Sequence, residues 1–404
     1  MAGVVVAGAG QAGFQVAASL RTDGYEGSIT LIGDEPWLPY QRPPLSKAFM
    51  TGKQDIEATT LRPETFYPDH HIDLLVGERV VAIDRAQCTV TLASGAAISF
   101  ESLVLATGAC NRLLPIKGAD LDGVCYLRSR DEAVAIAARL QDAQNVVVIG
   151  GGFIGLELTA AAVSLGKQVV VVEAQSRLMA RAVAPIMSEY FRNLHQSQGV
   201  RVVLDGITQE IVGGKRASDV LLTDGTIYPA DLVVVGIGVL PNAELAQSAG
   251  LAVGNGIAVD DHLTTDDPNI YAIGDCAQHP NRYAGGLVRL ESVQNAVDQA
   301  RCVSAAITGH ARPYDAVPWF WTDQFHAKLQ MVGLSQGFDA VITRGDPATH
   351  KFSVCYFKEN RLMAIDSINR PGDHLAGRKL LAAGTSLTPQ QAADLTIELK
   401  SHVS

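Results

Sequence analysis

Gly8-Ala9-Gly10-Gln11-Ala12-Gly13 is the stretch of sequence that decides the fold, because of what stands on either side of it. The apolar residues 4–7 precede it, the Ala-rich residues 14–20 follow it, and residues 29–32 form a second apolar run. These patterns predict a strand, a helix and a second strand. A G-x-G-x-x-G loop inside such a unit is typical of dinucleotide binding. We therefore expect a nucleotide site here.

Each glycine of this loop has its own task. Gly8 permits the tight turn after the strand, Gly10 lets a pyrophosphate approach the backbone, and Gly13 lets the helix pack close to the strand. The phosphates then accept hydrogen bonds from free N–H groups at the N-terminus of the helix.

The same pattern occurs a second time from Asn145 onward. An apolar strand at 146–149 leads into Gly150-Gly151-Gly152-Phe153-Ile154-Gly155, a helix is expected over 156–165, and a strand at 169–172 ends at Glu173. A carboxylate at this place accepts hydrogen bonds from a ribose 2′-OH and repels a 2′-phosphate, which predicts NADH rather than NADPH. Arg177 is the one feature that weakens this prediction. Two complete units predict two bound dinucleotides.

A third segment indicates which unit holds which nucleotide. Residues 270–273 form a late strand that runs into Gly274-Asp275, and a helix-like stretch follows. A carboxylate there could bind sugar-alcohol hydroxyls while the helix N-terminus faces another phosphate, and Asp275 could also cap that helix. FAD is long enough to need contacts at both places, and NAD has no ribityl chain. We therefore expect FAD in the first unit and NADH in the second.

The rest of the chain predicts an α/β protein with a smaller third part. Buried strands that end in glycines, at 103–108 and 232–238, mark the crossings between the nucleotide domains, and residues 240–242 read as a turn. Beyond Pro318, runs such as 352–357 predict strands of an α+β domain. We expect two Rossmann-like domains, for FAD (1–112 and 241–318) and NAD (113–240), and a C-terminal α+β domain (319–404).

Composition and charge exclude several classes of protein. The net charge is −10 and the pI is about 5.5, which argues against general binding to nucleic acids or anionic membranes. The N-terminus has no positive region before its apolar run, and no apolar stretch is long enough to span a membrane. The six cysteines are scattered, without C-x-x-C or metal-ligand spacing. We expect a soluble, cytoplasmic protein with free thiols and no metal site.

Six motifs follow one another in a fixed order. They are Gly8-Ala9-Gly10-Gln11-Ala12-Gly13, Arg42-Pro43-Pro44-Leu45-Ser46-Lys47, Ala106-Thr107-Gly108, Gly150-Gly151-Gly152-Phe153-Ile154-Gly155-Leu156-Glu157, Ile273-Gly274-Asp275 and Pro318-Trp319-Phe320-Trp321-Thr322-Asp323-Gln324. Together they resemble one family, the ferredoxin reductases of bacterial oxygenase systems, which are two-dinucleotide flavoproteins similar to glutathione reductase. The resemblance covers the whole chain, and its second and sixth motifs are the specific ones.

The resemblance implies roles for the matching residues. Those expected at the site of hydride transfer are Lys47, Glu157, Ile154 and Trp321. The residues expected to bind FAD are Gly8, Gly10, Ala12, Gly13, Asp34, Glu35, Arg42, Lys47, Val80, Ala106, Thr107, Gly108, Arg128, Asp275, Val293 and Trp321. Those expected to bind NAD are Gly150, Gly152, Phe153, Ile154, Gly155, Glu173, Arg181 and Gly238.

Two of these assignments keep an alternative. Gly33 stands where many relatives outside the group have a Glu, so either Asp34 or Glu35 must bind the FAD ribose. Glu157, judged from its place in the helix alone, could be an ordinary first-turn acid stabilised by the helix dipole by about 0.3–1 kcal/mol.

The electron acceptor follows from a missing thiol together with the resemblance. Disulfide reductases of this fold place a reactive cysteine shortly after the first nucleotide unit, and residues 36–60 contain none. Electrons must therefore leave at the flavin itself, which suits a one-electron acceptor. The resemblance implies a [2Fe–2S] ferredoxin that serves a haem monooxygenase or a Rieske dioxygenase. Such ferredoxins are acidic, so a basic docking patch is expected, with Arg301 as the candidate.

Two other functions stay open at this point. An NADH oxidase or diaphorase would use oxygen or quinones directly and would need no protein partner. A signalling flavoprotein resembling apoptosis-inducing factor would carry a basic nucleic-acid-binding surface and long disordered insertions, and the sequence shows neither.

Overall fold

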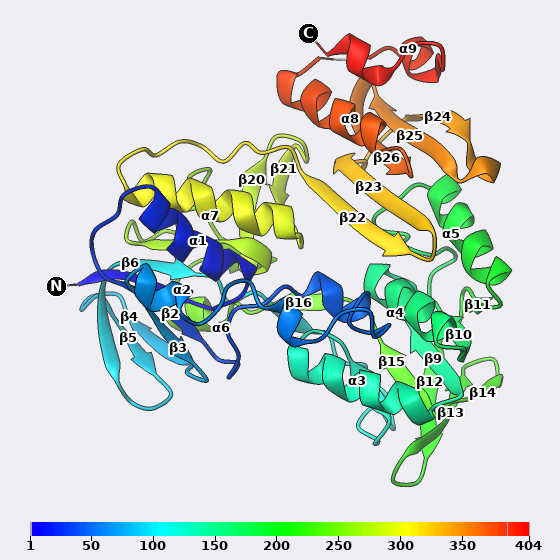
Figure 1. Cartoon of the computed structure of the whole chain (residues 1–404), viewed down its shortest axis with the longest axis horizontal. Coiled ribbons are helices and arrows are strands. Elements are labelled where there is room, and N and C mark those ends of the chain that lie inside the picture. Colours follow the sequence, from blue (N-terminus) through cyan, green and yellow to red (C-terminus); the bar gives the residue numbers. More distant parts are fainter. Residues whose placement is uncertain (1, 386, 404) are drawn as a thin grey trace. The chain divides into compact units, whose positions relative to one another are not determined.

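The computed structural model describes residues 2–385 and 387–403, which form two compact units (Figure 1). The first unit comprises Met1–Gln41, Thr60–Cys110 and Leu240–Phe320, and the second comprises Arg42–Thr59, Asn111–Val239 and Trp321–Ser404. Within the described part of the chain, no helix combines the length and apolar character needed to cross a membrane.

A seven-stranded sheet forms the core of the first unit. Its order is β3-β2-β1-β6-β5-β4, with β19 paired to β6. β1 lies parallel to both β2 and β6, and all five of its residues are buried, because a parallel strand in mid-sheet is covered on both faces. The strands are β1 (Gly3–Ala7), β2 (Ile29–Gly33), β3 (Ile72–Val76), β4 (Val80–Asp84), β5 (Thr89–Leu92), β6 (Ala97–Leu105) and β19 (Ile270–Ala272).

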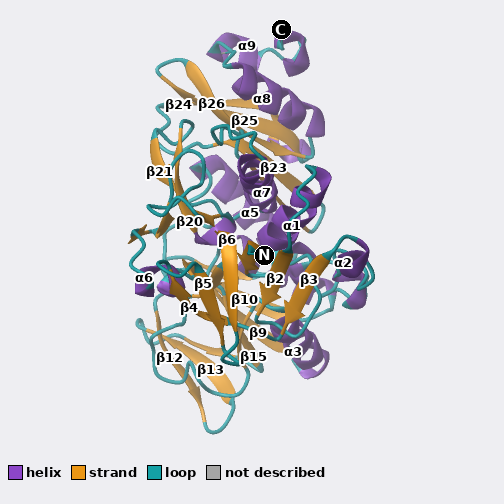
Figure 2. Cartoon of the chain, turned by 90° about the vertical axis from the view of Figure 1, so that its left-hand side faces the viewer, coloured by secondary structure: helices purple, strands orange, loops and turns teal. Residues whose placement is uncertain are grey.

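Two long helices of the first unit, α1 (Gln11–Thr22) and α7 (Val293–Ile307), pack side by side (Figures 1 and 2). The hydroxyl of Ser304 on α7 donates a 2.6 Å hydrogen bond to Asp23, directly after α1. This unit also contains α2 (Phe66–Asp69), α6 (Glu244–Ser248), β17 (Val253–Gly254), β18 (Gly256–Ala258), the turn η3 (Gly274–Cys276), β20 (Ala277–Asn281) and β21 (Gly286–Val288).

The second unit contains a parallel sheet of the same kind, in the order β11-β10-β9-β15-β8. α4 follows β9 directly and is buried over most of its surface. The elements of this region are η1 (Pro43–Ser46), η2 (Glu57–Thr59), β8 (Val124–Tyr126), α3 (Arg130–Asp142), β9 (Asn145–Ile149), α4 (Phe153–Ser164), β10 (Gln168–Val172), α5 (Pro185–Ser197), β11 (Arg201–Val203) and β15 (Leu232–Val235). A separate antiparallel sheet is formed by β12 (Thr208–Gly213), β13 (Ala217–Leu222) and β14 (Ile227–Pro229).

The C-terminal part is built on a five-stranded sheet in the order β22-β23-β26-β25-β24. β26 lies antiparallel to both β23 and β25. The elements are β22 (Trp319–Gln324), β23 (Ala327–Gly333), β24 (Ala340–Asp346), η4 (Pro347–Thr349), β25 (Lys351–Lys358), β26 (Arg361–Ile368), α8 (Pro371–Ala383), α9 (Pro389–Ala393) and η5 (Leu399–His402).

The predicted α/β fold with two nucleotide-binding βαβ units is confirmed, and two local predictions were wrong. The segment after Asp275 is not a helix: one 3-10 turn leads into strand β20, which pairs with β18 and β21, so sheet pairing overrides the local helical preference. Residues 240–242 do not form a simple turn, because β16 (Val239–Pro241) runs through them. The three domain boundaries stay a prediction.

Candidate functional site

The first glycine loop has the geometry that its sequence predicts. Gly8 has φ +115°, and a Cβ on it would lie 2.2 Å from the carbonyl oxygen of Ala106. A Cβ on Gly13 would lie 1.8 Å from the carbonyl oxygen of Gly8, so any side chain there would push α1 away from β1. At Gly10, by contrast, no heavy atom of the described residues lies within 4 Å of the Cβ position.

Among the described residues, no side chain caps the N–H groups at the start of α1. Gly10 is the N-cap residue and no side chain caps the helix, whereas Ser129 caps α3 and Ser292 caps α7. Uncapped N–H groups beside open space are what a pyrophosphate requires. The residues present therefore fit the FAD expected in this unit.

Two further segments of the first unit lie beside this loop. Ala106-Thr107-Gly108 continues from β6, and the N–H of Ala106 donates to the carbonyl of Ala7. The Thr107 hydroxyl donates to the carbonyl of Asn242 and the Asn242 amide donates back to the carbonyl of Thr107, at 2.6 and 2.8 Å. These two reciprocal hydrogen bonds between side chain and backbone fix the segment beside the glycine loop.

The structure explains why residue 33 is a glycine and not an acid. A Cβ on Gly33 would lie 2.6 Å from that of Ala9, so the loop leaves no room for an acid at this position. Glu35, two residues on, accepts a 2.6 Å hydrogen bond from the hydroxyl of Tyr40, and Asp34 is exposed. The segment that leads to Val80 runs alongside, because the N–H of Gly77 donates to the carbonyl of Glu35.

Asp275 lies in the turn η3 beside the start of α1. A Cβ on Gly274 would lie 3.1 Å from that of Ala12, and the N–H of Gly274 donates to the side chain of Gln299 on α7. Val293 is the first residue of α7. The structure thus brings Asp275, Ala12 and α7 together as predicted, but no α-helix begins at Asp275 to face a phosphate.

The second glycine loop repeats the geometry of the first. Gly150 has φ +107°, and a Cβ there would lie 2.3 Å from the carbonyl oxygen of Gly236. A Cβ on Gly155 would lie 2.2 Å from the carbonyl oxygen of Gly150, while Gly152 faces open space at the uncapped start of α4. These residues fit the pyrophosphate of NAD.

Glu173 lies at this loop and is fixed by the backbone. Its carboxylate accepts hydrogen bonds from the N–H of Gly151 at 2.6 Å and from the N–H of Gln175 at 2.8 Å. Arg181 is exposed, and its guanidinium lies against Gly238, 3.6 Å from where a Cβ would be. The predicted NAD residues thus come together in the second unit.

The side chain of Arg177 is hydrogen-bonded to the loop before α5. Its guanidinium donates to the carbonyls of Val183 and Ala180, both at 2.6 Å, and to the hydroxyl of Ser188 at 2.9 Å. The side chain therefore ties down the loop before α5, and the one feature that weakened the prediction of NADH is engaged in structural bonds.

Lys47 and Glu157 form a buried ion pair, with Nζ 2.7 Å from Oε1. The Glu157 carboxylate also accepts the hydroxyl of Thr322 on Oε1 at 2.7 Å and the hydroxyl of Ser46 on Oε2 at 2.5 Å. Glu157 is 2% exposed and lies beyond the first turn of α4. It is thus no ordinary first-turn acid, because three groups, one ammonium and two hydroxyls, bind its carboxylate. Ile154, one turn earlier, exposes 44% of its surface.

Two other predicted FAD residues meet in the second unit. Arg42 donates from Nη1 to the carbonyl of Arg128 at 2.5 Å. The N–H groups of Arg128 and Ser129 both donate to Glu132 at 2.7 Å, which fixes this turn at the start of α3. Trp321 is half-buried on β22.

The comparisons with known proteins agree with this geometry. The family described as pyridine nucleotide-disulphide oxidoreductase matches residues 2–300, and the family described as reductase C-terminal matches residues 319–403. The chain is 51% identical to rhodocoxin reductase of Rhodococcus erythropolis over 398 residues, which covers 98% of this chain and 93% of the relative. It is 39% identical to putidaredoxin reductase of Pseudomonas putida over 410 residues, which covers 99% and 96%.

The chain belongs to the ferredoxin reductases of the pyridine nucleotide-disulphide oxidoreductase family.

Solved structures of this family superpose closely on the reductase. The ferredoxin reductase for the CYP199A2 system from Rhodopseudomonas palustris has a TM-score of 0.98 at 50% identity, with both chains covered completely. Putidaredoxin reductase in its covalent complex with putidaredoxin has a TM-score of 0.97 at 39% identity, with 100% of this chain and 98% of the other covered. The reductase is an oxidoreductase that uses FAD and NAD(P)H, as its family does.

Several polar residues of the site were not predicted. Ser46 and Thr322 stand inside motifs of the resemblance, but we predicted no role for either. We also predicted none for Gln324 and His195. A signal for the first two existed, because each motif places a hydroxyl next to a residue that was predicted. His195 had no such signal.

Proposed function

We propose that the reductase takes electrons from NADH, in preference to NADPH, and delivers them singly to a [2Fe–2S] ferredoxin that serves an oxygenase. Relatives named rhodocoxin reductase and putidaredoxin reductase, which the chain matches over nearly its whole length, support the ferredoxin. The free state of all six cysteines supports a cytoplasmic location, where thiols stay reduced.

The observation that carries the choice of NADH is the position of Glu173. Its carboxylate is fixed by two backbone N–H groups at the second glycine loop, which supports its proposed role as the acceptor of hydrogen bonds from a ribose 2′-OH. A 2′-phosphate would bring a second anion against it, and Arg177 is bound to other groups.

Bound FAD supplies the redox chemistry, since it accepts two electrons as a hydride and can release them one at a time. The protein holds the pyrophosphates at the starts of α1 and α4. The apolar, exposed Ile154 offers a surface to the nicotinamide ring, and Lys47 with Glu157 forms a fixed charge pair beside the place of hydride transfer. Glu35, held by Tyr40, is the better placed of the two candidates for the FAD ribose.

Neither the region after the first nucleotide unit nor four of the six cysteines offers a reactive thiol to carry electrons. Residues 36–60 contain no cysteine. Burial raises the pKa of the Cys125 and Cys276 thiols, that of Cys302 to about 11 and that of Cys355 to about 12. Thiols of this kind are poor nucleophiles, because the thiolate is the reactive form.

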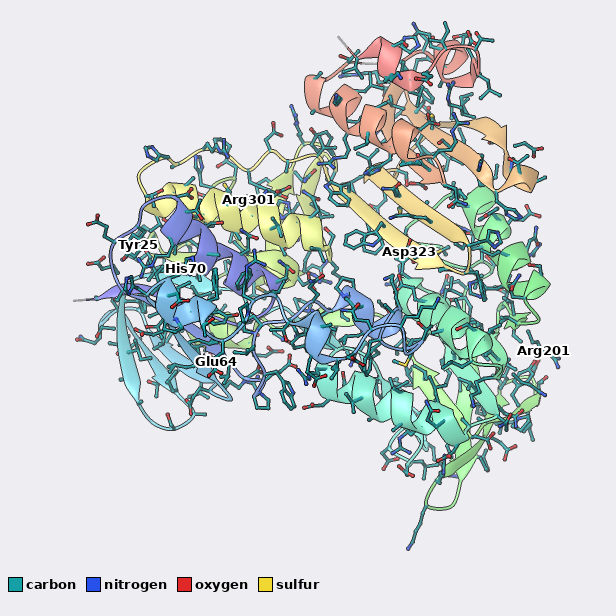
Figure 3. All side chains as sticks on the ribbon, viewed as in Figure 1. Tyr25, Glu64, His70, Arg201, Arg301 and Asp323 are labelled. Atoms are coloured by element: carbon teal, nitrogen blue, oxygen red, sulfur yellow. The ribbon has the colours of Figure 1, made fainter. Side chains whose placement is uncertain are left out.

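The proposed docking surface for the ferredoxin surrounds Arg301 on α7 (Figure 3). The Arg301 side chain is 60% exposed and makes a weak contact with Asp298, over 3.5 Å. Arg301, His310 and Arg312 line one hollow of about 530 Å³. Arg301 follows Val293 by eight residues, about 12 Å along the helix axis. The two arginines outnumber Asp23, the one acid that lines the same hollow, and at this distance from the flavin-binding end of α7 they suit an acidic partner.

The test is the anaerobic reduction of putidaredoxin by the FAD-loaded reductase with NADH, followed by the visible spectrum of the iron–sulfur cluster. We expect rapid, saturable reduction with NADH and at least tenfold lower kcat/KM with NADPH. Equal turnover with oxygen or a quinone alone would instead identify an oxidase or diaphorase. Preference for a rubredoxin, the acceptor named for relatives that are 41% identical, would replace the proposed acceptor with another.

A further inference from the structure

Strand β22 carries a motif whose two faces have different environments. Side chains alternate between the faces of a strand, so Thr322 and Gln324 share one face while Trp321 and Asp323 share the other. Thr322 and Gln324 are completely buried, whereas Trp321 and Asp323 are half-buried. The polar pair thus lies inside the protein, where each polar atom requires a partner.

These partners form a chain of hydrogen bonds that ends on Glu157. The Thr322 hydroxyl lies 2.7 Å from Oε1 of Glu157, and Nε2 of Gln324 lies 3.3 Å from the Thr322 hydroxyl. Oε1 of Gln324 lies 2.9 Å from Nε2 of His195 on α5. His195 is 0% exposed and packs edge-on against the ring of Phe325.

Every hydrogen bond of this chain donates in the same direction. Since the Gln324 carbonyl accepts, His195 must carry its proton on Nε2, and burial lowers the pKa of His195 to about 4, so the ring is neutral near pH 7. The Gln324 amide donates to the Thr322 hydroxyl, whose own proton points at the carboxylate of Glu157. Hydrogen bonds aligned in this way polarise and strengthen one another.

We propose that Thr322 and Gln324 are positioning residues for the reduction of the flavin by NADH. They hold the carboxylate of Glu157, and through it the ammonium of Lys47, in one place. The inference rests on the proposed position of the Lys47–Glu157 pair beside the site of hydride transfer. His195 is the remote end of the chain and orients the Gln324 amide.

These hydrogen bonds matter because they end on the ion pair that we place beside the site of hydride transfer. Glu157 Oε1 accepts from both Lys47 and Thr322, so loss of the hydroxyl leaves the carboxylate free to turn about its remaining partners. Lys47 is the more exposed of the pair, with 19% of its side chain accessible. The position of its ammonium therefore depends on the position of the carboxylate that binds it. Small displacements of groups beside a reaction reduce its rate strongly.

The experiment is anaerobic stopped-flow reduction of the FAD-loaded enzyme by NADH, which separates the limiting rate of flavin reduction from the apparent Kd for NADH. We expect Thr322→Val to lower the limiting rate about tenfold, the effect of losing one hydrogen bond to a charged group, with the Kd unchanged. Thr322→Ser keeps the hydroxyl and should restore the rate to within about twofold of the wild type. Gln324→Met should lower the rate about threefold, because the Thr322 hydroxyl then loses its orienting donor.

A matched control separates positioning from loss of stability. Ser353 on β25 of the same sheet is also completely buried, and its hydroxyl donates to Asp373 at 2.8 Å. Ser353→Ala removes a buried hydroxyl far from Glu157 along the chain and should lower the Tm without changing the limiting rate. A drop in rate for Ser353→Ala as large as that for Thr322→Val would overturn the proposal.

Glu157→Gln separates the positioning role of Thr322 and Gln324 from the assignment on which it rests, that of the Lys47–Glu157 pair to the site of hydride transfer. If Glu157→Gln slows flavin reduction but Thr322→Val does not, the positioning role is overturned and the ion pair keeps its place. If Glu157→Gln itself leaves the limiting rate unchanged, the assignment of the Lys47–Glu157 pair fails, and the proposed role of Thr322 and Gln324 fails with it.

Discussion

The carboxylate of Glu173 accepts a hydrogen bond from the backbone N–H of Gly151 over 2.6 Å, so the acid that ends one strand is fixed against the loop that ends its neighbour. Parallel pairing of β9 and β10 in register places these two strand ends side by side. The acid is thus in place before any nucleotide binds.

Glu173→Gln should weaken the preference for NADH. The amide keeps the size of the side chain but loses its charge, so the ribose loses a charge-assisted hydrogen bond worth about 1.5–3 kcal/mol and a 2′-phosphate is no longer repelled. We expect kcat/KM for NADH to fall at least tenfold and that for NADPH to rise. Steady-state kinetics with both nucleotides measure the ratio.

Arg177→Lys is the control for this prediction. Arg177 ties down the loop before α5 through the carbonyls of Ala180 and Val183, so its loss should raise KM for both nucleotides alike. A change in the NADH to NADPH ratio in this variant, or none in Glu173→Gln, would contradict the roles given to these two residues.

Two glycines of the first loop should respond differently to alanine. A Cβ on Gly13 would lie 1.8 Å from a backbone oxygen, and β1 and α1 cannot both keep their places around it. Gly13→Ala should therefore fail to fold or lose FAD altogether. Gly10→Ala meets open space in the protein and should fold, but its methyl group occupies room meant for the pyrophosphate. The absorbance ratio at 450 and 280 nm measures bound flavin, and circular dichroism measures the fold.

Gly214→Ala serves as the reference for both variants. This glycine also faces open space, in a surface hairpin far along the chain from either glycine loop. Its flavin content and Tm should equal those of the wild type. Full flavin content in Gly10→Ala would argue against a pyrophosphate at that position.

The parts of the site that could be predicted from the sequence are those whose chemistry is local. Gly8, Gly13 and Glu173 follow a fixed spacing within one βαβ unit, and the backbone enforces each of them through close contacts with its own strand or loop. Lys47 and Glu157 were each assigned to the site of hydride transfer only through the family resemblance. Their ion pair was not predicted, since 110 positions separate the two residues.

The parts that could not be predicted depend on distant contacts. His195 and Gln324 lie 129 positions apart and meet only because α5 packs against the C-terminal sheet. The direction of the Arg177 side chain depends on carbonyls that a sequence does not place. The helix expected after Asp275 became strand β20 because two neighbouring strands were available to pair with it.

Arg344 should prove essential for the C-terminal segment. Its guanidinium, 1% exposed, donates to the carbonyls of Ala392, Asp394 and Ile397. Arg344→Lys keeps the charge but cannot reach three carbonyls with one ammonium. We expect a loss of about 3 kcal/mol in the free energy of unfolding and faster hydrogen exchange over residues 388–403, read by mass spectrometry.

Arg361→Lys is the matched control, because Arg361 is exposed on β26, another strand of the same sheet. It should change neither the stability nor the exchange of the C-terminal segment. Unchanged exchange in Arg344→Lys would show that other contacts hold the segment.

Asp366 should make the stability of the C-terminal sheet depend on pH. The side chain is 1% exposed, and burial raises its pKa to about 7, although the hydroxyl of Tyr356 opposes this by donating to the carboxylate. Arg344, Arg370 and Asp373 are the other charged groups around this buried cluster. The folded form holds the proton more tightly than the unfolded form, so the stabilisation is complete below about pH 4 and is lost as the pH rises to about 7.

Asp366→Asn should remove this dependence. Relative to the wild type, the variant should gain stability between pH 5 and pH 8, by up to about 4 kcal/mol. The Tm measured across this range in both proteins checks it, with Asp142→Asn as the control because Asp142 is exposed at the end of α3. Parallel Tm curves for Asp366→Asn and the wild type would show that the carboxyl does not titrate in this range.

Arg301→Glu should slow the association with the ferredoxin and leave the reaction with NADH intact. The side chain lies on the exposed side of α7 and its contact with Asp298 is weak, so its removal costs the fold little. Reversing the charge beside His310 and Arg312 turns an attraction for an acidic partner into a repulsion. We expect the second-order rate of putidaredoxin reduction to fall on the order of tenfold at low salt, and the difference to shrink as salt screens it. Lys215→Glu makes the same change in charge on the exposed hairpin between β12 and β13 and should have little effect. If both variants slow the reaction equally, net charge rather than a docking surface at Arg301 governs the encounter, and the partner binds elsewhere.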